Sequence, residues 1–341
     1  MKPVRVSLIG AGYFGQFHYD AWARMHDVEI VAMCVRPGED ASSTAVRYGV
    51  PATYEDAEMM VADTAPDIVD ITAPPQAHKA LLEGLAGKVR WIICQKPFCN
   101  SIDEARSVMA VVDSAGSRVI IHENVRFQPW YREIRQLMND GAIGAPFQIS
   151  FRLRPGDGQG HEAYLDRQPY FQTMPRFLIR ETAIHWIDTF RFLFGEVTGI
   201  FADLHRLNPA IAGEDAGILQ MTFQNGARGL FDGNRLADHA AANKRLTMGE
   251  LLVEGSDGAI ALDGNARLSR RVLGGTDWVP HAYAWANRNF GGDCVFATNR
   301  AALEALRTGS TVENEAKVYL RNMELVEAAY QSNEERRWVD V

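Results

Sequence analysis

Short apolar runs alternate with segments of helical composition over the first 124 residues. The apolar runs lie at 4–9, 28–35, 67–71, 91–94 and 118–121, and the helical segments at 16–24, 41–48, 55–62, 76–85 and 101–115. Strands that alternate with helices predict a sheet of parallel strands joined by right-handed crossovers. The carboxyl ends of such strands meet at one edge of the sheet, where ligands bind.

The pattern changes near Glu123 and Asn124. It predicts a helix over 128–139, an alternating strand over 147–153, a long polar loop over 154–175 and a helix over 180–194. Hairpin signals follow at 224–226, 256–258 and 263–264, and closing helices are predicted over 290–308 and 313–332. We therefore expect an α/β domain over residues 1–124 and an α+β domain over residues 125–341.

The composition excludes several classes of function. The chain has 341 residues, 47% hydrophobic and 23% charged, with a net charge of −8. That negative charge argues against electrostatic binding of nucleic acid. No apolar run reaches the roughly 18 residues of a membrane span. Cys34, Cys94, Cys99 and Cys294 lack metal-type spacing. Such cysteines are typical of reduced thiols, so we expect a cytoplasmic protein.

Three glycines follow the first predicted strand. Gly10, Gly12 and Gly15 have the G-x-G-x-x-G spacing and stand between a strand and a helix. In that context the first glycine makes a tight turn, the second admits a pyrophosphate, and the third lets helix and strand pack closely. The helix N-terminus then offers free N–H groups to phosphate. A tight turn without a ligand is the alternative.

The end of the second predicted strand bears on the choice of cofactor. An acidic residue 20–25 positions after the glycines usually binds the ribose 2′-hydroxyl, but Val35 stands there and Arg36 follows. Loss of the carboxylate and gain of a guanidinium favour a 2′-phosphate, and so NADP over NAD. An arginine on a surface turn can also be merely solvated.

Several polar residues follow the other predicted strands. Lys96 and Ala73 are placed at the cofactor edge, where an ammonium can stabilise a developing alkoxide. His78, His122 and Glu123 also lie near strand ends, and each alone suits a structural or cofactor-adjacent role.

The helix predicted over 180–194 is a second focus. Glu181 and His185 are four residues apart and share a face, which Asp188 can join. A histidine beside a carboxylate suits proton transfer near neutral pH. The same side chains could bind a metal, but the spacing lacks a second histidine, so we expect none. An Asp–His pair with a purely structural role is the other alternative.

Arginines surround the long loop. Arg154, Arg176 and Arg180 are candidates for binding a polyhydroxylated or carboxylated substrate through bidentate contacts.

Taken in order, these motifs resemble those of the Gfo/Idh/MocA oxidoreductase family over nearly the whole chain. The matching stretches are 10–15, 67–78, 94–97, 181–188 and 313–332. The resemblance implies a Rossmann domain followed by an α+β domain with a large open, mostly antiparallel sheet. It also implies homodimers or homotetramers formed through that sheet, and NAD- or NADP-dependent chemistry on sugars, inositol-like polyols or sugar acids.

Residue roles follow from the same resemblance. The expected cofactor-binding residues then also include Tyr13, Phe14, Pro74 and Gln95. Lys96 matches the lysine of the family's motif, and His185 matches its general acid/base. Glu181 matches the residue that assists this histidine. Gln95 replaces the usual glutamate, Glu181 replaces aspartate and Val35 replaces aspartate.

The expected reaction is hydride transfer between nicotinamide C4 and a secondary carbinol, with His185 as base and Lys96 bound to the same oxygen. A glycoside-cleaving enzyme that recycles its NAD, or a catalytically silent nucleotide sensor, is the alternative.

Overall fold

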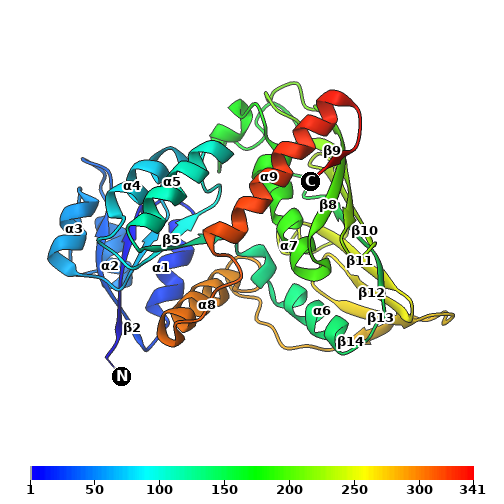
Figure 1. Ribbon diagram of the computed structural model, residues 1–341, viewed down its shortest axis with the longest axis horizontal. Coiled ribbons are helices and arrows are strands. Elements are labelled where there is room, and N and C mark those ends of the chain that lie inside the picture. Colours follow the sequence, from blue (N-terminus) through cyan, green and yellow to red (C-terminus); the bar gives the residue numbers. More distant parts are fainter. Residues whose placement is uncertain (1) are drawn as a thin grey trace. The chain divides into compact units, whose positions relative to one another are not determined.

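The computed structural model describes residues 2–341, and the chain forms two compact units (Figure 1). The first unit runs up to Asn124 and includes Cys294–Met323, while the second holds Val125–Asp293 and Glu324–Val341. The sequence predicts a single boundary after residue 124, whereas in the structure the late segment Cys294–Met323 belongs to the first unit. The cause is an apolar stripe on α8 (Cys294–Thr308), whose Ala302 and Leu303 join the core around Tyr19 and Trp22. The expected domain boundaries otherwise stay a prediction.

The first unit is built on a six-stranded parallel sheet, in the order β3-β2-β1-β4-β5-β6. Its strands are β1 (Val4–Ile9), β2 (Val28–Cys34), β3 (Thr53–Tyr54), β4 (Ile68–Ile71), β5 (Trp91–Gln95) and β6 (Arg118–His122). Its helices are α1 (Gly15–Ala23), α2 (Ser42–Tyr48), α3 (Ala57–Thr64), α4 (His78–Leu85), α5 (Ile102–Ser114) and α8. This strand order is that of dinucleotide-binding sheets and confirms the expected α/β architecture.

Local sequence explains why these elements form. The central strands are apolar on both faces, as buried parallel strands must be, and Val6, Leu8 and Ile93 are fully buried. The hydroxyl of Ser101 accepts the backbone N–H of Glu104, so α5 begins where its capping signal stands. β3 has only two residues, too few to leave a periodic signal in the sequence.

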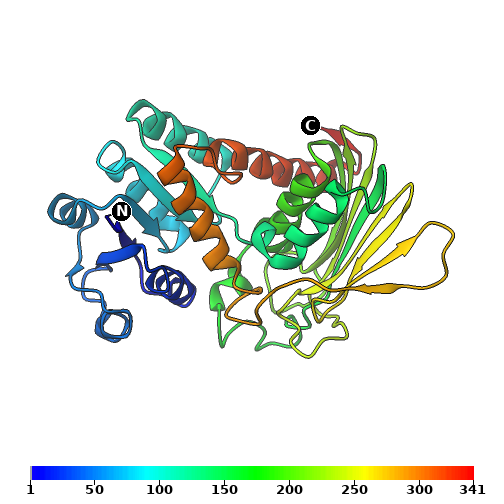
Figure 2. The ribbon, with the colours of Figure 1, turned by 90° about the horizontal axis from the view of Figure 1, so that it is seen from below.

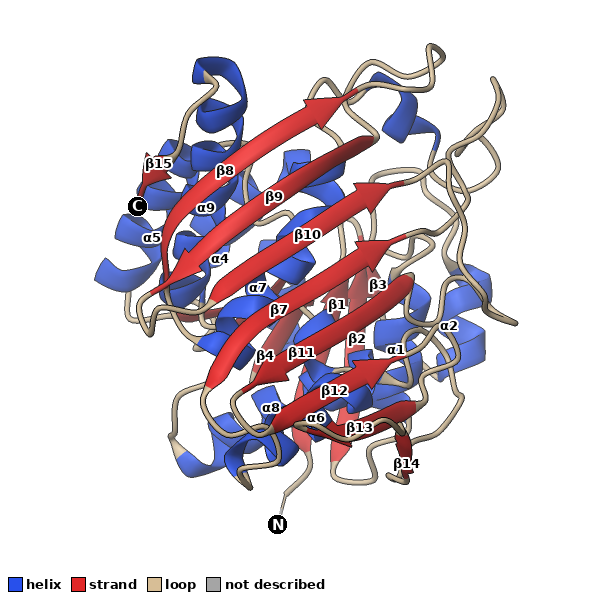
Figure 3. Ribbon diagram, turned by 90° about the vertical axis from the view of Figure 1, so that its right-hand side faces the viewer, coloured by secondary structure: helices blue, strands red, loops and turns tan. Residues whose placement is uncertain are grey.

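The second unit is built on a nine-stranded sheet, in the order β14-β13-β12-β11-β7-β10-β9-β8-β15 (Figure 3). Its strands are β7 (Pro146–Leu153), β8 (Val197–His205), β9 (Ala216–Phe223), β10 (Arg228–Asn234), β11 (Gly249–Gly255), β12 (Gly258–Leu262), β13 (Leu268–Val272), β14 (Val279–His281) and β15 (Val339–Asp340). Among the described strands of this second sheet, only β7 and β10 pair in parallel. The sheet is thus open and mostly antiparallel, as expected.

Helices cover one face of this sheet (Figure 2). They are α6 (Pro129–Asn139), α7 (Ile184–Phe194) and part of α9 (Ala316–Glu335), which begins in the first unit. Within the described second unit no helix covers the opposite face, which is turned to the viewer in Figure 3. Burial alternates along β9 accordingly, with Leu219 and Met221 inward and Ile218 and Gln220 outward.

Two helices differ from their expected bounds. The helix expected from residue 290 begins at Cys294, because Gly291, Gly292 and Asp293 have φ angles of 54°, 67° and 68°, which interrupt a right-handed helix. The helix expected over 180–194 is a π-helix, Leu178–Ala183, followed by α7. Its first N–H groups are diverted to a side chain, since Oε1 of Glu214 accepts from Phe177 and Ile179 at 3.2 and 3.1 Å.

Candidate active site

The glycine turn between β1 and α1 has the shape that a dinucleotide requires. Gly10 has a φ of 102°, and a Cβ there would lie 3.0 Å from the backbone of Thr72 and Ala73. A Cβ on Gly15 would lie 3.0 Å from the Thr72 hydroxyl oxygen, whereas one on Gly12 would meet no atom within 4 Å. Gly10 and Gly15 therefore let the turn pack against the end of β4, and Gly12 keeps open space before the N-terminus of α1. The residues present fit a dinucleotide whose phosphates lie at this turn.

The turn after β2 carries Val35 and Arg36. Val35 is buried, and its N–H donates to the carbonyl of Tyr54 at 2.9 Å. The Arg36 side chain is 79% exposed, and its Nε lies 3.0 Å from Oε2 of Glu39. The guanidinium is thus at the edge of the sheet, but a carboxylate of the same turn already binds it.

Lys96 follows β5 at the edge that carries the glycine turn. Its side chain is half-buried, and its backbone N–H donates to Oε1 of Gln95 at 2.9 Å. His78 braces the next residues, since Nδ1 lies 3.1 Å from the carbonyl oxygens of Pro97 and Phe98 and Nε2 lies 2.9 Å from that of Ala73. The backbone of Lys96 and of the two residues after it is therefore held by side chains of its own unit.

Three polar candidates near this edge are interior. His78 is fully buried, and burial lowers its pKa despite hydrogen bonds that raise it. We therefore revise its expected contact with the cofactor to a supporting role for the loops that end β4 and β5. His122 is also buried, and burial lowers its pKa to about 3. Glu123 is fully buried and accepts the Tyr319 hydroxyl at 3.4 Å.

The second unit presents Glu181 and His185 across the junction of the π-helix and α7. Glu181 is 7% exposed and His185 is half-buried. A single π turn inside a helix is frequent at functional sites. The Asp188 carboxylate accepts hydrogen bonds from Nε and Nη2 of Arg126, each at 2.6 Å, and both side chains are buried. Among residues 2–341 no group of three or more His, Cys, Asp or Glu side chains is arranged to bind a metal.

Two of the three candidate arginines support the fold. Arg154 donates to the backbone carbonyl of Asp232 at 2.8 Å and also binds its carboxylate. Arg176 binds Glu327 at 2.7 Å, and its guanidinium lies 4.4 Å from the centre of the Tyr330 ring. Both side chains thus already have protein partners, and their assignment as substrate ligands stays a prediction. Arg180, in the π-helix and half-buried, remains a candidate.

An ion pair under the long loop was missed by the sequence analysis. Nη2 of Arg235, a buried residue, lies 2.6 Å from Oδ2 of Asp157. Its guanidinium also lies 5.0 Å from the ring centre of Tyr164 and 4.8 Å from that of Phe177. The loop expected over 154–175 thus has its own small core. The sequence carries no signal for it, because Arg235 and Asp157 are 78 residues apart.

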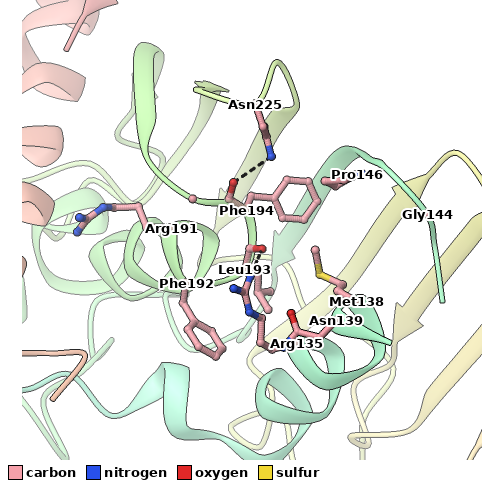
Figure 4. Close-up of a pocket in the computed structure, with 11 residues that line it drawn as sticks. Arg135, Met138, Asn139, Gly144, Pro146, Arg191, Phe192, Leu193, Phe194 and Asn225 are labelled. Atoms are coloured by element: carbon pink, nitrogen blue, oxygen red, sulfur yellow. Dashed lines mark hydrogen bonds between the residues drawn. The ribbon is translucent and has the colours of Figure 1, made fainter. Parts of the chain in front are cut away.

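A surface pocket lies at the other end of α7 (Figure 4). It has a volume of about 360 Å³. Arg135 donates to the carbonyl of Leu193 at 2.9 Å, and Asn225 donates to that of Phe194 at 3.1 Å. At a rise of 1.5 Å per residue, Phe194 lies roughly 14 Å along the helix from His185. The pocket is therefore separate from the candidate acid/base pair.

Comparison with known proteins identifies the family. Residues 4–123 match the family model described as "Oxidoreductase family, NAD-binding Rossmann fold", and residues 131–261 match the Gfo/Idh/MocA C-terminal domain. A D-apiose dehydrogenase of Paraburkholderia graminis is 33% identical over 100% of this chain and 90% of its own length. A D-apiose dehydrogenase of Rhizobium rhizogenes is 31% identical, with 100% and 98% covered.

Solved structures agree with the sequence relatives. The crystal structure of an oxidoreductase from Agrobacterium radiobacter in complex with NAD+, L-tartaric acid and magnesium is 29% identical, with a TM-score of 0.87. The match covers 99% of this chain and 98% of that one. None of the helices within residues 2–341 has the length and apolarity to cross a bilayer. The glycine turn, the lysine after β5 and these matches together show that the chain belongs to the Gfo/Idh/MocA family of NAD(P)-dependent oxidoreductases.

Proposed function

We propose that the protein transfers a hydride between the nicotinamide of NAD(P) and a secondary hydroxyl of a sugar, polyol or sugar acid. One observation carries the proposal: Lys96 leaves the same sheet edge as the glycine turn, in a chain that belongs to an oxidoreductase family. Relatives named D-apiose dehydrogenase support a sugar, and the neighbour bound to L-tartaric acid supports a hydroxy acid.

The proposed chemistry divides between the two units. In oxidation, His185 accepts the proton of the substrate hydroxyl as general base. The Lys96 ammonium donates a hydrogen bond to the same oxygen and stabilises the charge that develops there. Glu181 orients His185, and Arg180 contributes to substrate binding. The bound nicotinamide supplies the hydride acceptor.

The cofactor would be held chiefly by residues of the first unit. Gly10, Gly12 and Gly15 would hold the phosphates with Tyr13 and Phe14 beside them. Val35 and Arg36 would lie at the adenosine ribose; Ala73, Pro74, Gln95 and Lys96 would line the nicotinamide end. Burial of the Gln95 side chain limits it to an indirect role there. We propose NADP over NAD, because Arg36 is exposed and Val35 offers no carboxylate.

Replacing Arg36 tests this preference. Arg36→Ala is expected to weaken NADPH binding about tenfold, since one charge-assisted contact is lost, and to leave NADH binding unchanged. Glu39→Gln is the matched variant: it releases Arg36 from its present partner and is expected to tighten NADPH binding. The measurement is the dissociation constant of each dinucleotide by fluorescence titration. Equal effects on NADH and NADPH in Arg36→Ala would contradict the preference.

The function itself is tested by following NAD(P)H absorbance with a panel of aldoses, inositols and aldonates. Reduction of the cofactor by at least one class is expected. Cleavage of a glycoside without net NAD(P)H formation would instead indicate a hydrolytic enzyme. Dinucleotide binding without turnover of any compound would indicate a sensor.

We also propose that copies of the chain associate through the open face of the second sheet. Ile218 on β9 is 40% exposed on this face. Ile218→Glu is expected to shift the light-scattering mass toward that of the monomer, and an unchanged mass would contradict this interface. The expected location is the cytoplasm, which the four buried cysteines with free thiols support.

A further inference from the structure

The side-chain amide of Gln95 connects three polar groups beneath the edge of the first sheet. Its Oε1 accepts the backbone N–H of Lys96 at 2.9 Å. Its Nε2 lies 2.8 Å from Nε2 of His18 and 3.4 Å from Nδ1 of His122. The two histidines are buried, with their ring centres 4.0 Å apart. Every hydrogen-bonding atom of this amide therefore faces a protein partner.

The backbone N–H of Lys96 fixes the direction of this network. It can only donate, so the carbonyl oxygen of Gln95 must face it and the NH₂ group must face the two rings. Because an NH₂ group donates, Nε2 of His18 and Nδ1 of His122 must both accept. Each ring then carries its proton on the other nitrogen and is neutral. That nitrogen of His122, Nε2, lies 2.9 Å from Oδ1 of Asn299, which can accept.

The network ends on a buried carboxylate. Nδ1 of His18 donates to Oδ2 of Asp70 at 2.8 Å, and the same oxygen accepts Nε1–H of Trp22 at 2.7 Å. Burial opposes ionisation of Asp70, but hydrogen bonds from His18 and Trp22 favour the carboxylate, and the pKa of the carboxyl lies below its usual range. Hydrogen bonds therefore run in one sense, from Lys96 through Gln95 and His18 to Asp70.

We propose that Gln95 is a positioning residue for Lys96. Its amide, anchored through His18 on Asp70, holds the backbone of Lys96 and sets the direction in which the ammonium leaves the sheet edge. His78 holds the carbonyls of the two residues that follow, so the turn is fixed on both sides. A carboxylate at position 95 could not donate to either ring, and His18 would have to become the donor. The inference rests on the proposed role of Lys96 in catalysis.

The direction of the network is tested without any assay of activity. In the cofactor-free protein labelled with ¹⁵N-histidine, long-range ¹H–¹⁵N spectra report which ring nitrogen carries the proton. His18 signals are assigned by their loss in His18→Asn. We expect an unprotonated Nε2 in the wild type and a protonated Nε2 in Gln95→Glu. A protonated Nε2 in the wild type would overturn the network, and that result needs no variant at position 95 to fold.

The positioning role is tested by kinetics of Gln95→Glu and Gln95→Met. We expect kcat to fall about tenfold while KM and the dissociation constant of NAD(P)H stay within about threefold, because only the reacting ammonium is displaced. Gln224→Glu makes the same change at an exposed glutamine in the turn after β9 and should leave kcat unchanged. An unchanged kcat in both position-95 variants, or parallel losses of kcat, cofactor affinity and melting temperature, would overturn the proposal.

A variant at Lys96 separates this inference from the function on which it rests. In a Lys96→Met background, Gln95→Met should have no further effect on the residual rate. A further tenfold loss there would mean that Gln95 acts through another group and would overturn the positioning role. If Lys96→Met alone kept full activity, the proposed function of Lys96 would be wrong. The position of the proton on His18 would still be decided by the NMR spectra alone.

Discussion

Lys96→Met is expected to lower kcat by about 10³-fold while NAD(P)H binding changes little. The ammonium is proposed to stabilise charge that exists on the substrate oxygen only as the hydride leaves, and one such donor contributes roughly 10²–10³ in rate. The phosphates of the cofactor would be held at the glycine turn between β1 and α1, whereas Lys96 follows β5. Replacing Lys96 should therefore leave the phosphate contacts intact. Steady-state rates and a fluorescence titration of NAD(P)H provide the two measurements.

Lys88→Met is the matched control for this variant. Lys88 is in the same unit and half-exposed, and it pairs with Glu58 at the surface. Its replacement should leave kcat unchanged and should alter stability by at most about 1 kcal/mol. Full activity in Lys96→Met would remove Lys96 from the chemistry, and lost cofactor binding would assign it to the dinucleotide instead.

His185→Asn is expected to lower kcat by about 10²–10⁴-fold, the usual contribution of a general base. Added imidazole or a higher pH should restore part of the rate, because another base can then accept the hydroxyl proton. The measurement is the rate of the wild type and of His185→Asn, each with and without imidazole. The control is His161→Asn, since the His161 side chain is 88% exposed on the long loop. A normal rate in His185→Asn, or a lost rate that no base restores, would contradict the assignment.

The features that the sequence predicts well are those set by neighbouring residues. The glycine turn, the apolar strands and the cap at Ser101 each depend on a few consecutive positions, and the structure has all of them. The parallel direction of the strands in the first sheet follows from the alternation of strands and helices. Lys96 could be placed at the edge for the same reason, because it comes directly after a predicted strand.

The features that the sequence could not show depend on distant partners. Asp188 shares a helix with His185, yet Arg126, 62 residues away, binds it. Arg176 is bound by Glu327, 151 residues away, and Arg154 by Asp232, 78 residues away. No local pattern shows that a charged side chain is already bound in this way. The same holds for Glu214, whose carboxylate caps the π-helix from another segment.

Gln95 shows how a residue can change meaning between sequence and structure. In the sequence, Gln95 is notable only because it replaces the glutamate that usually precedes the lysine in this family. In the structure its amide accepts the backbone N–H of Lys96, as a carboxylate could, but it also donates to His18 and His122, which a carboxylate cannot do. The departure from the family pattern is therefore accompanied by a matching environment, which only the positions of His18 and His122 reveal.

The central claim is that Lys96 and His185 act on the same substrate oxygen, and a double-mutant cycle tests it most directly. The values of kcat/KM are measured for Lys96→Met, His185→Asn and the double variant with one sugar substrate. Residues that act as a unit lose far less together than the product of their separate losses. We predict that the kcat/KM of the double variant lies within about tenfold of that of the less active single variant. Losses that multiply in full would show that the two side chains act independently, and would contradict the account.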